Sequence, residues 1–204
     1  MELLGSSEIS LVLNGYSTTP AIPVPGYELY IFYGETGEDI SRSFELGHPG
    51  NEFEAYRMLF SNRQQDFGYT FNYFGTELPD NLIVPQRPLF NVDNPEIKGF
   101  EISTDLDYKR KEIRWSNLEP RSFGNNRRIE WKVFSSFTSS SVIGDIPEEI
   151  LNGYPDMDVS GLTYEYSYLH VGPYSQNEFL EAKFRGEDYE ILFSNLEFFY
   201  FYPQ

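Results

Sequence analysis

The two histidines of the chain are the first candidates for acid–base or nucleophilic chemistry, because imidazole titrates closest to neutral pH. His48 lies in the turn-like stretch GHPG, and His170 lies in the tyrosine-rich stretch LTYEYSYLHVG. The chain has no G-x-S-x-G nucleophile motif, no H-E-x-x-H metal pattern and no glycine-rich phosphate loop. We therefore expect a surface histidine and a packed strand histidine, and the sequence assigns no catalytic residue.

Carboxylates are the second source of chemistry, because the chain has 32 aspartates and glutamates. Asp105 and Asp107 alternate in STDLD, and Asp156 and Asp158 alternate in PDMDVSG, a spacing that oxygen ligands of Ca²⁺ can have. Neither stretch continues to the distal glutamate of a calcium loop, so solvated turn aspartates are the preferred interpretation. A carboxylate pair of the glycosidase type stays open, since a sequence does not give the distance between two acids. We expect no metal ion and no cofactor.

The most uneven feature of the sequence is a basic window between residues 109 and 132. It holds eight of the 15 lysines and arginines but only three acids, so its net charge is +5. The whole chain carries −17, which leaves −22 for the remainder. Both tryptophans fall in the same window, and arginine and tryptophan are enriched at binding hot spots. The candidate binding residues are Arg110, Arg114, Trp115, Arg121, Arg127, Arg128 and Trp131.

Three interpretations of the basic window remain open. It can contact acidic surface on a protein partner, or on the next copy in a head-to-tail homo-oligomer. It can bind an anionic ligand such as a phosphate or an acidic sugar, and tyrosines interleaved with acids add carbohydrate to the candidate ligands. Alternatively, its bases neutralise neighbouring acids on the same molecule while the tryptophans fill the core, since surface ion pairs are common and weak. The acidic remainder argues against nucleic acid and anionic membranes as partners.

Length and composition limit the class of protein. A chain of 204 residues favours one β-rich domain over residues 1–204, with a weak boundary in SSFTSSSVIG at residues 135–144. The absence of cysteine excludes disulfides and thiolate metal sites. The N-terminal stretch lacks a basic region, and no apolar run approaches the roughly 20 residues that span a bilayer. We expect no signal peptide and no transmembrane segment, so synthesis is expected in the cytoplasm, and a virion is one candidate location.

Strand patterns dominate the chain. Large apolar or aromatic residues alternate in YELYIFYG (27–34), GYTFNYFG (68–75), RRIEWKVFSS (127–136) and LTYEYSYLHVG (162–172). Alternation with a period of two, bounded by glycine, proline, asparagine or serine, predicts half-buried strands. The aromatic run LEFFYFY near the C-terminus predicts a last strand that is covered on both faces.

Helical patterns are few. NEFEAYRMLF at residues 51–60 predicts a short helix with Asn51 as its N-cap. IPEEILNGY at residues 146–154 predicts one or two helical turns, with Pro147 at the first position and Gly153 at the C-terminal cap. The proline-rich stretches TTPAIPVPG and LPDNLIVPQRPLFNVDNPE are expected to be connections, because each proline removes a backbone donor from a strand ladder.

Three segments of the chain follow a similar order and suggest an internal repeat. Each begins with phenylalanine, passes through a polar stretch and ends on an aromatic residue followed by Ser-Asn, at residues 44–62, 100–117 and 179–195. Ser-Asn side chains bond the local backbone and thereby favour turns. The repeat predicts three hairpins with Phe60, Trp115 and Phe193 in equivalent buried places. The alternative is composition bias in a β-rich chain.

These patterns together predict an all-β fold. It is either an antiparallel β-sandwich or a pseudo-threefold repeated β fold of the trefoil or prism type, with one or two short helices. The expected function is that of a non-catalytic assembly or recognition protein, such as a virion or appendage component or a lectin-like module.

Two other functions stay open at this point. A cofactor-independent β-barrel enzyme acting on an apolar small molecule would need a deep aromatic pocket that contains an acid with a raised pKa. An acidic inhibitor that mimics nucleic acid would need rows of carboxylates at phosphate-like spacing, and the basic window counts against it.

Overall fold

The computed structural model describes residues 7–17, 27–36, 52–117, 129–137, 146–154, 161–187 and 195–203. Within these ranges the chain is mostly β, with ten strands in antiparallel sheets and two short helices, so the predicted all-β class is confirmed. The strands are β1 (Ser7–Tyr16), β2 (Tyr27–Thr36), β3 (Ala55–Arg63), β4 (Phe67–Gly75), β5 (Phe90–Asn94), β6 (Glu101–Thr104), β7 (Arg110–Ser116), β8 (Glu130–Ser136), β9 (Thr163–Val171) and β10 (Leu196–Phe201). The helices are α1 (Glu148–Gly153) and α2 (Gln176–Phe184).

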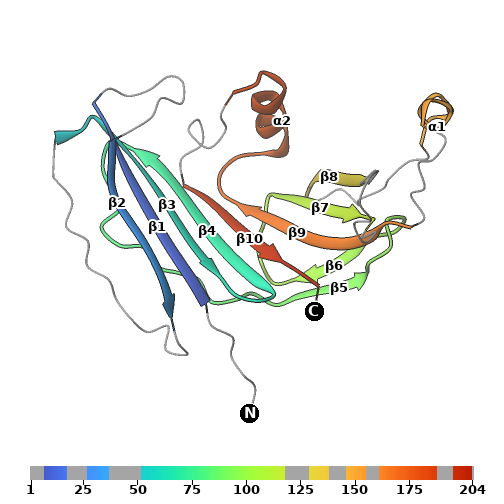
Figure 1. Cartoon of the computed structure of the whole chain (residues 1–204), viewed down its shortest axis with the longest axis horizontal. Helices are drawn as coiled ribbons and strands as arrows, with labels where there is room; N and C mark the ends of the chain where they lie inside the picture. Colours follow the sequence, from blue (N-terminus) through green and yellow to red (C-terminus); the bar gives the residue numbers. More distant parts are fainter. Residues whose placement is uncertain are drawn as a thin grey trace, which may run out of the picture.

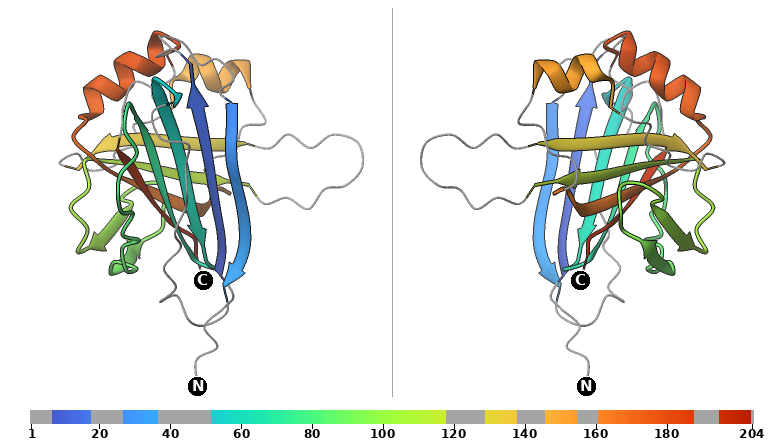
Figure 2. Two further views of the ribbon diagram at one scale, coloured as in Figure 1. Left: turned by 90° about the vertical axis from the view of Figure 1, so that its left-hand side faces the viewer. Right: turned by 90° about the vertical axis from the view of Figure 1, so that its right-hand side faces the viewer.

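Eight of these strands form one antiparallel sheet in the order β2-β1-β3-β4-β10-β9-β7-β8. β5 and β6 form a separate antiparallel hairpin (Figure 1). The large sheet twists strongly, so that β7, β8 and β9 run across the direction of β1 to β4 (Figure 2). β10 joins the two halves, because it pairs with β4 on one side and with β9 on the other. This topology does not confirm the sandwich or the threefold arrangement expected from the sequence.

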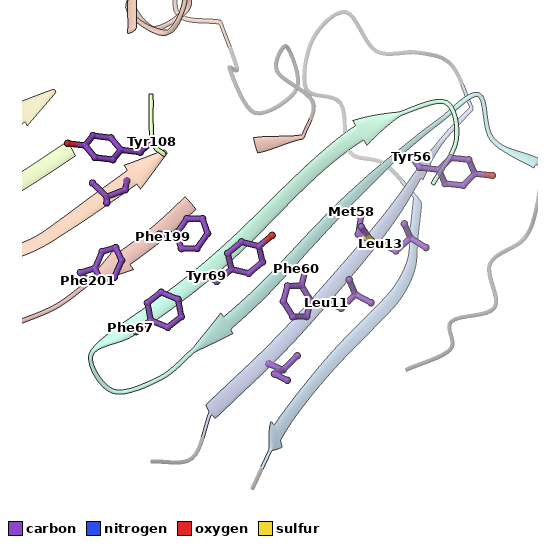
Figure 3. Packing of buried hydrophobic residues seen from close by; sticks show 12 residues of the cluster. Leu11, Leu13, Tyr56, Met58, Phe60, Phe67, Tyr69, Tyr108, Phe199 and Phe201 are labelled. Atoms are coloured by element: carbon purple, nitrogen blue, oxygen red, sulfur yellow. The ribbon is translucent and has the colours of Figure 1, made fainter. Parts of the chain in front are cut away.

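One face of the large sheet carries the main core. Alternate residues of β3, β4 and β10 are buried there, and Figure 3 shows among them Tyr56, Met58, Phe60, Phe67, Tyr69, Phe199 and Phe201. The stretch between β4 and β7 covers this face, with Leu82, Val84 and Phe90 packed against it. The ring of Phe90 stacks on that of Phe201, with centroids 3.9 Å apart. Each large apolar side chain fully buried in this way stabilises the fold by about 1.5–3 kcal/mol.

A second, smaller core lies between the β5–β6 hairpin and β7. Phe100, Ile113 and Trp115 are buried in it, and Trp131 of β8 packs against them. The side chain of Trp115 is fully buried, and its indole N–H donates a hydrogen bond to the Pro95 carbonyl at 3.0 Å. The hairpin is therefore fixed to the large sheet at β7 as well as at β10.

The aromatic last strand is buried on both faces, as the sequence predicts. Phe199 and Phe201 lie in the main core. Phe198 points to the other face and packs edge-on against His170 of β9, with ring centroids 4.7 Å apart. All three phenylalanines are buried.

The helix predicted for residues 51–60 is wrong, because residues 55–63 form β3. β3 pairs with β1 on one side and with β4 on the other. Tyr56, Met58, Phe60 and Asn62 are buried at every second position, which is the period of a strand. Helix-forming side chains in EAYRMLF are overridden here by two neighbouring strands and a buried face.

The second predicted helix is confirmed as α1, although its caps differ. Pro147 is the N-cap residue and not the first helical residue, and Tyr154 follows the helix as its C-cap. Helix α2 was not predicted, although its N-cap Ser175 and Glu178 form a capping box that the sequence S-x-x-E already shows. Neither described helix is long and apolar enough to cross a bilayer.

The proposed internal repeat is only partly within the described residues. Phe60 in β3 and Trp115 in β7 are both buried near the end of a strand that forms a hairpin with the next strand. Phe193 lies outside the described residues. The polar stretch differs between units, because Phe179 lies in helix α2 whereas Phe100 directly precedes strand β6. His48, Asp156, Asp158 and most of the boundary suggested for residues 135–144 also lie outside the described residues.

Candidate functional site

The face of the sheet opposite the main core carries a continuous set of charged and tyrosine side chains across β8, β7, β9 and β10. We call it the polar–aromatic face. Strand register brings its members together: Arg114 pairs with Lys132 of β8 and with Tyr166 of β9, and Tyr168 pairs with Tyr200 of β10. The face comprises Glu112, Arg114, Glu130, Lys132, Glu165, Tyr166, Tyr168, Tyr200 and Tyr202.

Arg114 is the centre of the charged part of this face. Its guanidinium contacts Glu130 at 2.6 Å and Glu165 at 2.7 Å, and Lys132 contacts Glu130 at 3.0 Å. The hydroxyl of Ser116 also donates a hydrogen bond to Glu165. The shift in register between Arg114 and Trp115 in the β7–β9 pair adds a residue to β9 at this point. A strand irregularity of this kind re-aims side chains, and here Glu165 reaches the same face as Tyr166.

The tyrosines form the other part of the polar–aromatic face. Tyr166 and Tyr168 stack with ring centroids 4.0 Å apart, and Tyr200 meets Tyr168 edge-on at 4.3 Å. The hydroxyl of Tyr166 donates to Glu112 at 3.1 Å. Tyr168 and Tyr200 are half-buried, so packing holds the rings in place while part of each side chain reaches the surface. The face therefore presents fixed hydrogen-bonding groups and not mobile side chains.

Electrostatic shifts follow from these contacts. Burial alone would lower the pKa of Arg114, but the hydrogen bond with Tyr166 and the charges of Glu165 and Glu130 raise it overall. The hydrogen bond to Glu130 raises the pKa of Lys132. Burial raises the pKa of Tyr166 and, more strongly, that of Tyr168. Near neutral pH Arg114 and Lys132 are therefore charged, and Tyr166 and Tyr168 are protonated.

The candidate residues from the basic window fall into four groups. Trp115 is core, and Trp131 is half-buried against the smaller core. Arg114 lies on the polar–aromatic face between two glutamates. Arg110 is buried beside His170, away from that ion network. Arg121, Arg127 and Arg128 lie outside the described residues, between β7 and β8 in the sequence.

Two of these placements match the interpretation in which bases neutralise neighbouring acids and tryptophans fill the core. Arg114 pairs with a neighbouring glutamate, Glu130, and Trp115 fills the core. Lys111 is also buried, and desolvation lowers its pKa. Whether the window as a whole binds a partner stays a prediction.

A small hollow lies where helix α2 packs on the end of β7 and β9. Its lining is Arg110, His170, Val171, Gly172, Tyr174, Ser175, Phe179 and Leu196. The guanidinium of Arg110 donates a hydrogen bond to Nδ1 of His170 and lies 3.3 Å above the ring of Phe179. The pair was not foreseen from the sequence, because cross-strand register brings together two residues that are 60 positions apart. The described residues contain no group of three or more histidine, aspartate or glutamate side chains placed to hold a metal ion.

Comparison with known proteins adds one partial similarity. No protein-family model matches the sequence, and no solved structure matches it. Three catalase-peroxidases, from two strains of Aspergillus fumigatus and from Neosartorya fischeri, are 30% identical to this chain over 118 residues. The similarity covers 57% of this chain, and the chain spans about 14% of the length of these curated relatives. It is a likeness to one stretch of much longer proteins.

Proposed function

We propose that the protein is a non-catalytic assembly and recognition protein, in which the polar–aromatic face of one copy contacts the β5–β6 hairpin of the next. The observation that carries this proposal is the placement of two dissimilar surfaces on opposite sides of β7 and β9. Helix α2 and the polar–aromatic face lie on one side, and the β5–β6 hairpin lies on the other (Figure 1).

The first support is the chemistry of the polar–aromatic face. Tyrosine and arginine are the residue types that interfaces favour, because they combine a large contact area with directed hydrogen bonds. The Arg114 network and the stacked tyrosines are held by their own neighbours, so little side-chain entropy remains to be lost when a partner binds.

The second support is the charge of the hairpin side. Residues 76–108 hold seven acids and two bases, a net charge of −5. Glu101, Asp105 and Asp107 are exposed, together with Asp93 and Glu96 on the β5 side of the hairpin. Arg121, Arg127 and Arg128, which follow β7 in the sequence, would supply opposite charge from the neighbouring copy.

Contact between two different surfaces of identical chains is heterologous, and repetition of such a contact builds rings or filaments. A virion or appendage component would use this property directly. A lectin-like module would use the same tyrosines and carboxylates toward a carbohydrate, and carbohydrate binding without self-association is the outcome that would replace the proposal.

For the fold, we infer a partial sandwich in which the β5–β6 hairpin is the second layer over half of the large sheet. The contacts of Phe90 with Phe201 and of Phe100 with Trp115 support this arrangement. The hairpin would then be both a structural cover and one of the two contact surfaces.

A charge-swap experiment tests the assembly. The double variant Arg127→Glu/Arg128→Glu and the double variant Glu101→Lys/Asp107→Lys should each weaken self-association, because each places like charges across the contact. The chain that carries all four substitutions should regain association, since opposite charges face each other again.

The control is Glu148→Lys/Glu149→Lys, which makes the same charge change in α1, a helix without buried residues. Circular dichroism should show that all variants stay folded. Association that is unchanged in both charge-reversed variants would sink the proposed contact, as would a loss of association in the control of equal size.

A further inference from the structure

We propose that helix α2 is a lid over one end of the polar–aromatic face, and that protonation of His170 opens this lid. The inference does not depend on the assembly, because it concerns contacts of α2 within one chain. It rests on three observations, namely the few side chains that attach α2, the glycines on either side of the helix, and the position of His170 beneath it.

Few side chains attach helix α2 to the sheet. Phe179 and Ala182 are the buried residues of the helix. The ring of Phe179 lies 3.3 Å from the guanidinium of Arg110 on β7, and its centroid is 5.8 Å from that of Phe134 on β8. The ammonium group of Lys183 lies 4.1 Å from the ring of Phe134. A segment with so little buried apolar surface is of the kind that opens locally while the rest of the fold stays intact.

Two glycines with positive φ flank the helix. Gly172 directly follows β9 and has a φ of 151°, and Gly186 follows α2 and has a φ of 69°. Glycine adopts such conformations at no steric cost, and small residues at the ends of elements often serve as hinges. The capping box between Ser175 and Glu178 stabilises the first turn of α2 itself. The segment between the two glycines can therefore move as one unit.

His170 of β9 lies beneath the lid. The residue is 8% exposed, and its ring packs edge-on against Phe198 of β10 with centroids 4.7 Å apart. The ring of Phe179 is 6.4 Å away on the side of α2. The guanidinium of Arg110 donates a hydrogen bond to Nδ1 of His170. Arg110 also has other interactions, so more than this one contact holds its guanidinium in place.

Protonation of His170 is incompatible with the closed lid. Because a guanidinium only donates, Nδ1 accepts, and the proton of the neutral ring is on Nε2. A second proton would have to bind Nδ1, where it would face an N–H of Arg110 and remove the hydrogen bond. Burial, and then the charge of Arg110, accordingly hold the pKa of His170 well below its ordinary value. Nε2 is buried and has no hydrogen-bond partner among the described residues, so none of them stabilises the charged ring there.

The other titratable groups on the surrounding elements do not offset this conflict. Among the described residues they are Arg110 on β7, Tyr168 on β9, Tyr174 after β9, Tyr200 on β10, and Glu178 and Lys183 on α2. Glu178 is the carboxylate of this set, and it accepts from the N–H and the hydroxyl of Ser175. These hydrogen bonds lower the pKa of Glu178. The set therefore offers two cations, and its one carboxylate is already bonded in the capping box.

Opening of the lid resolves the conflict. When α2 swings away, water reaches the ring, and His170 takes up a proton near its ordinary pKa of 6.5. The open form then binds a proton that the closed form does not, so the ratio of open to closed chains rises as the pH falls below 6.5 and is constant above it. Between pH 7.5 and pH 5.5 this ratio should rise about tenfold.

The open lid exposes aromatic surface. Phe134 loses its contact with Phe179, and the packed pair of His170 and Phe198 faces solvent. Phe198 lies next to Tyr200, with ring centroids 6.4 Å apart, so the surface under the lid continues the polar–aromatic face. Mild acid thereby adds apolar area to the surface that this face offers to a partner.

Hydrogen exchange of the full chain, followed by mass spectrometry, tests the lid. The exchange rates of the α2 amides, corrected for the intrinsic effect of pH, should rise about tenfold between pH 7.5 and pH 5.5. The amides of β4 and β10 should exchange more slowly than those of α2 at both pH values, since only then does α2 open without unfolding of the sheet. Corrected α2 rates that are equal at the two pH values, or equal to those of β10, would overturn the proposal.

Two variants assign the effect to His170. His170→Gln keeps hydrogen-bonding atoms but does not titrate, so its corrected α2 rates should change by less than about twofold over the same pH range. Glu178→Gln weakens the capping box, so it should raise the α2 rates by a similar factor at both pH values and keep the change of about tenfold. Loss of the pH effect in Glu178→Gln would show that the capping box, and not His170, is the switch. The wild-type rates decide the matter even if a variant does not fold.

Discussion

Arg114 of β7 and Glu165 of β9 form an ion pair of 2.7 Å on the polar–aromatic face, and only 17% and 15% of their side chains are exposed. An ion pair shielded from water to this degree is more sensitive to the loss of one partner than a surface pair, because the remaining charge stays partly buried. The carboxylate of Glu165 also accepts a hydrogen bond from the hydroxyl of Ser116. It therefore links two positions of β7 to β9.

Glu165→Gln should therefore lower the free energy of unfolding by about 1.5–3 kcal/mol, the range for hydrogen bonds to charged groups. The matched control is Glu181→Gln, which breaks the exposed pair with Arg185 on α2 and should cost less than about 0.5 kcal/mol. Urea denaturation followed by circular dichroism measures both. Equal effects of the two substitutions would show that the Arg114 network has no special role in stability.

Substitutions of the two tryptophans should lower the free energy of unfolding by different amounts. Trp115→Ala removes a fully buried side chain and leaves the Pro95 carbonyl without its donor, and should cost about 3–5 kcal/mol. Trp131→Phe keeps an aromatic ring at a half-buried position and should cost less than about 1.5 kcal/mol. Urea midpoints of the two variants test this order. If Trp115→Ala unfolded at the wild-type midpoint, the smaller core would not be as described.

The free energy of unfolding should decrease as the pH is lowered below 6.5, and His170 should contribute to this decrease. Its pKa in the folded chain is lowered from the ordinary value of 6.5, first by burial and then by Arg110. Below pH 6.5 the unfolded chain takes up a proton that the folded chain does not, so the free energy of unfolding decreases as pH falls. Above pH 6.5 the ring is neutral in both states, and the effect vanishes. The limiting slope is about 1.4 kcal/mol per pH unit.

Among the described residues, the groups that face His170 are Arg110 on β7 and the apolar rings of Phe198 on β10 and Phe179 on α2, with Tyr174 in the lining of the hollow. Replacing the ring with glutamine removes the titration and keeps hydrogen-bonding atoms. The loss of stability between pH 7 and pH 5 should thus be smaller in His170→Gln than in the wild type. Thermal unfolding at several pH values is the measurement, and parallel curves for wild type and His170→Gln would contradict the prediction.

Helix α2 should depend on its N-cap. The hydroxyl of Ser175 accepts from the Glu178 N–H, and the Glu178 carboxylate accepts from the Ser175 N–H at 2.8 Å. Ser175→Ala should lower stability by about 1 kcal/mol, whereas Ser175→Asp keeps an acceptor at the cap and should cost less. Chemical denaturation compares the two. If Ser175→Asp cost more stability than Ser175→Ala, the N-cap would not be what holds α2, with Phe179, against Arg110.

Alternation of large apolar or aromatic residues located five of the ten described strands, namely β2, β4, β8, β9 and β10, because these residues follow the period of two that a strand has. The stretches YELYIFYG and LTYEYSYLHVG became β2 and β9, and RRIEWKVFSS contains β8. The same rule failed for β3, where Glu54, Ala55 and Met58 favour a helix locally. Pairing with β1 and β4 on both sides decided that segment, and such pairing is not visible in a single stretch of sequence.

The candidate sites were harder to foresee than the strands. The basic window drew attention to Arg110 and Arg114, but their partners Glu165 and His170 come from β9, about 50 to 60 positions later. Only the register between β7 and β9 brings them together, and a shift in that register after Arg114 makes simple counting fail. Helix α2, in contrast, was within reach of sequence reasoning through its capping box.

The central claim is that copies of this chain assemble by contact of two different surfaces, with the arginines that follow β7 in the sequence opposite the acidic hairpin of the next copy. The mass of the protein in solution tests this claim most directly. Light scattering on the full chain over a range of protein concentrations should give masses above the 23.8 kDa of one copy, rising with concentration. Added salt should lower the mass, because exposed charges are screened beyond about 10 Å at 0.1 M ionic strength. A mass of one copy at every concentration and at low salt would contradict the claim.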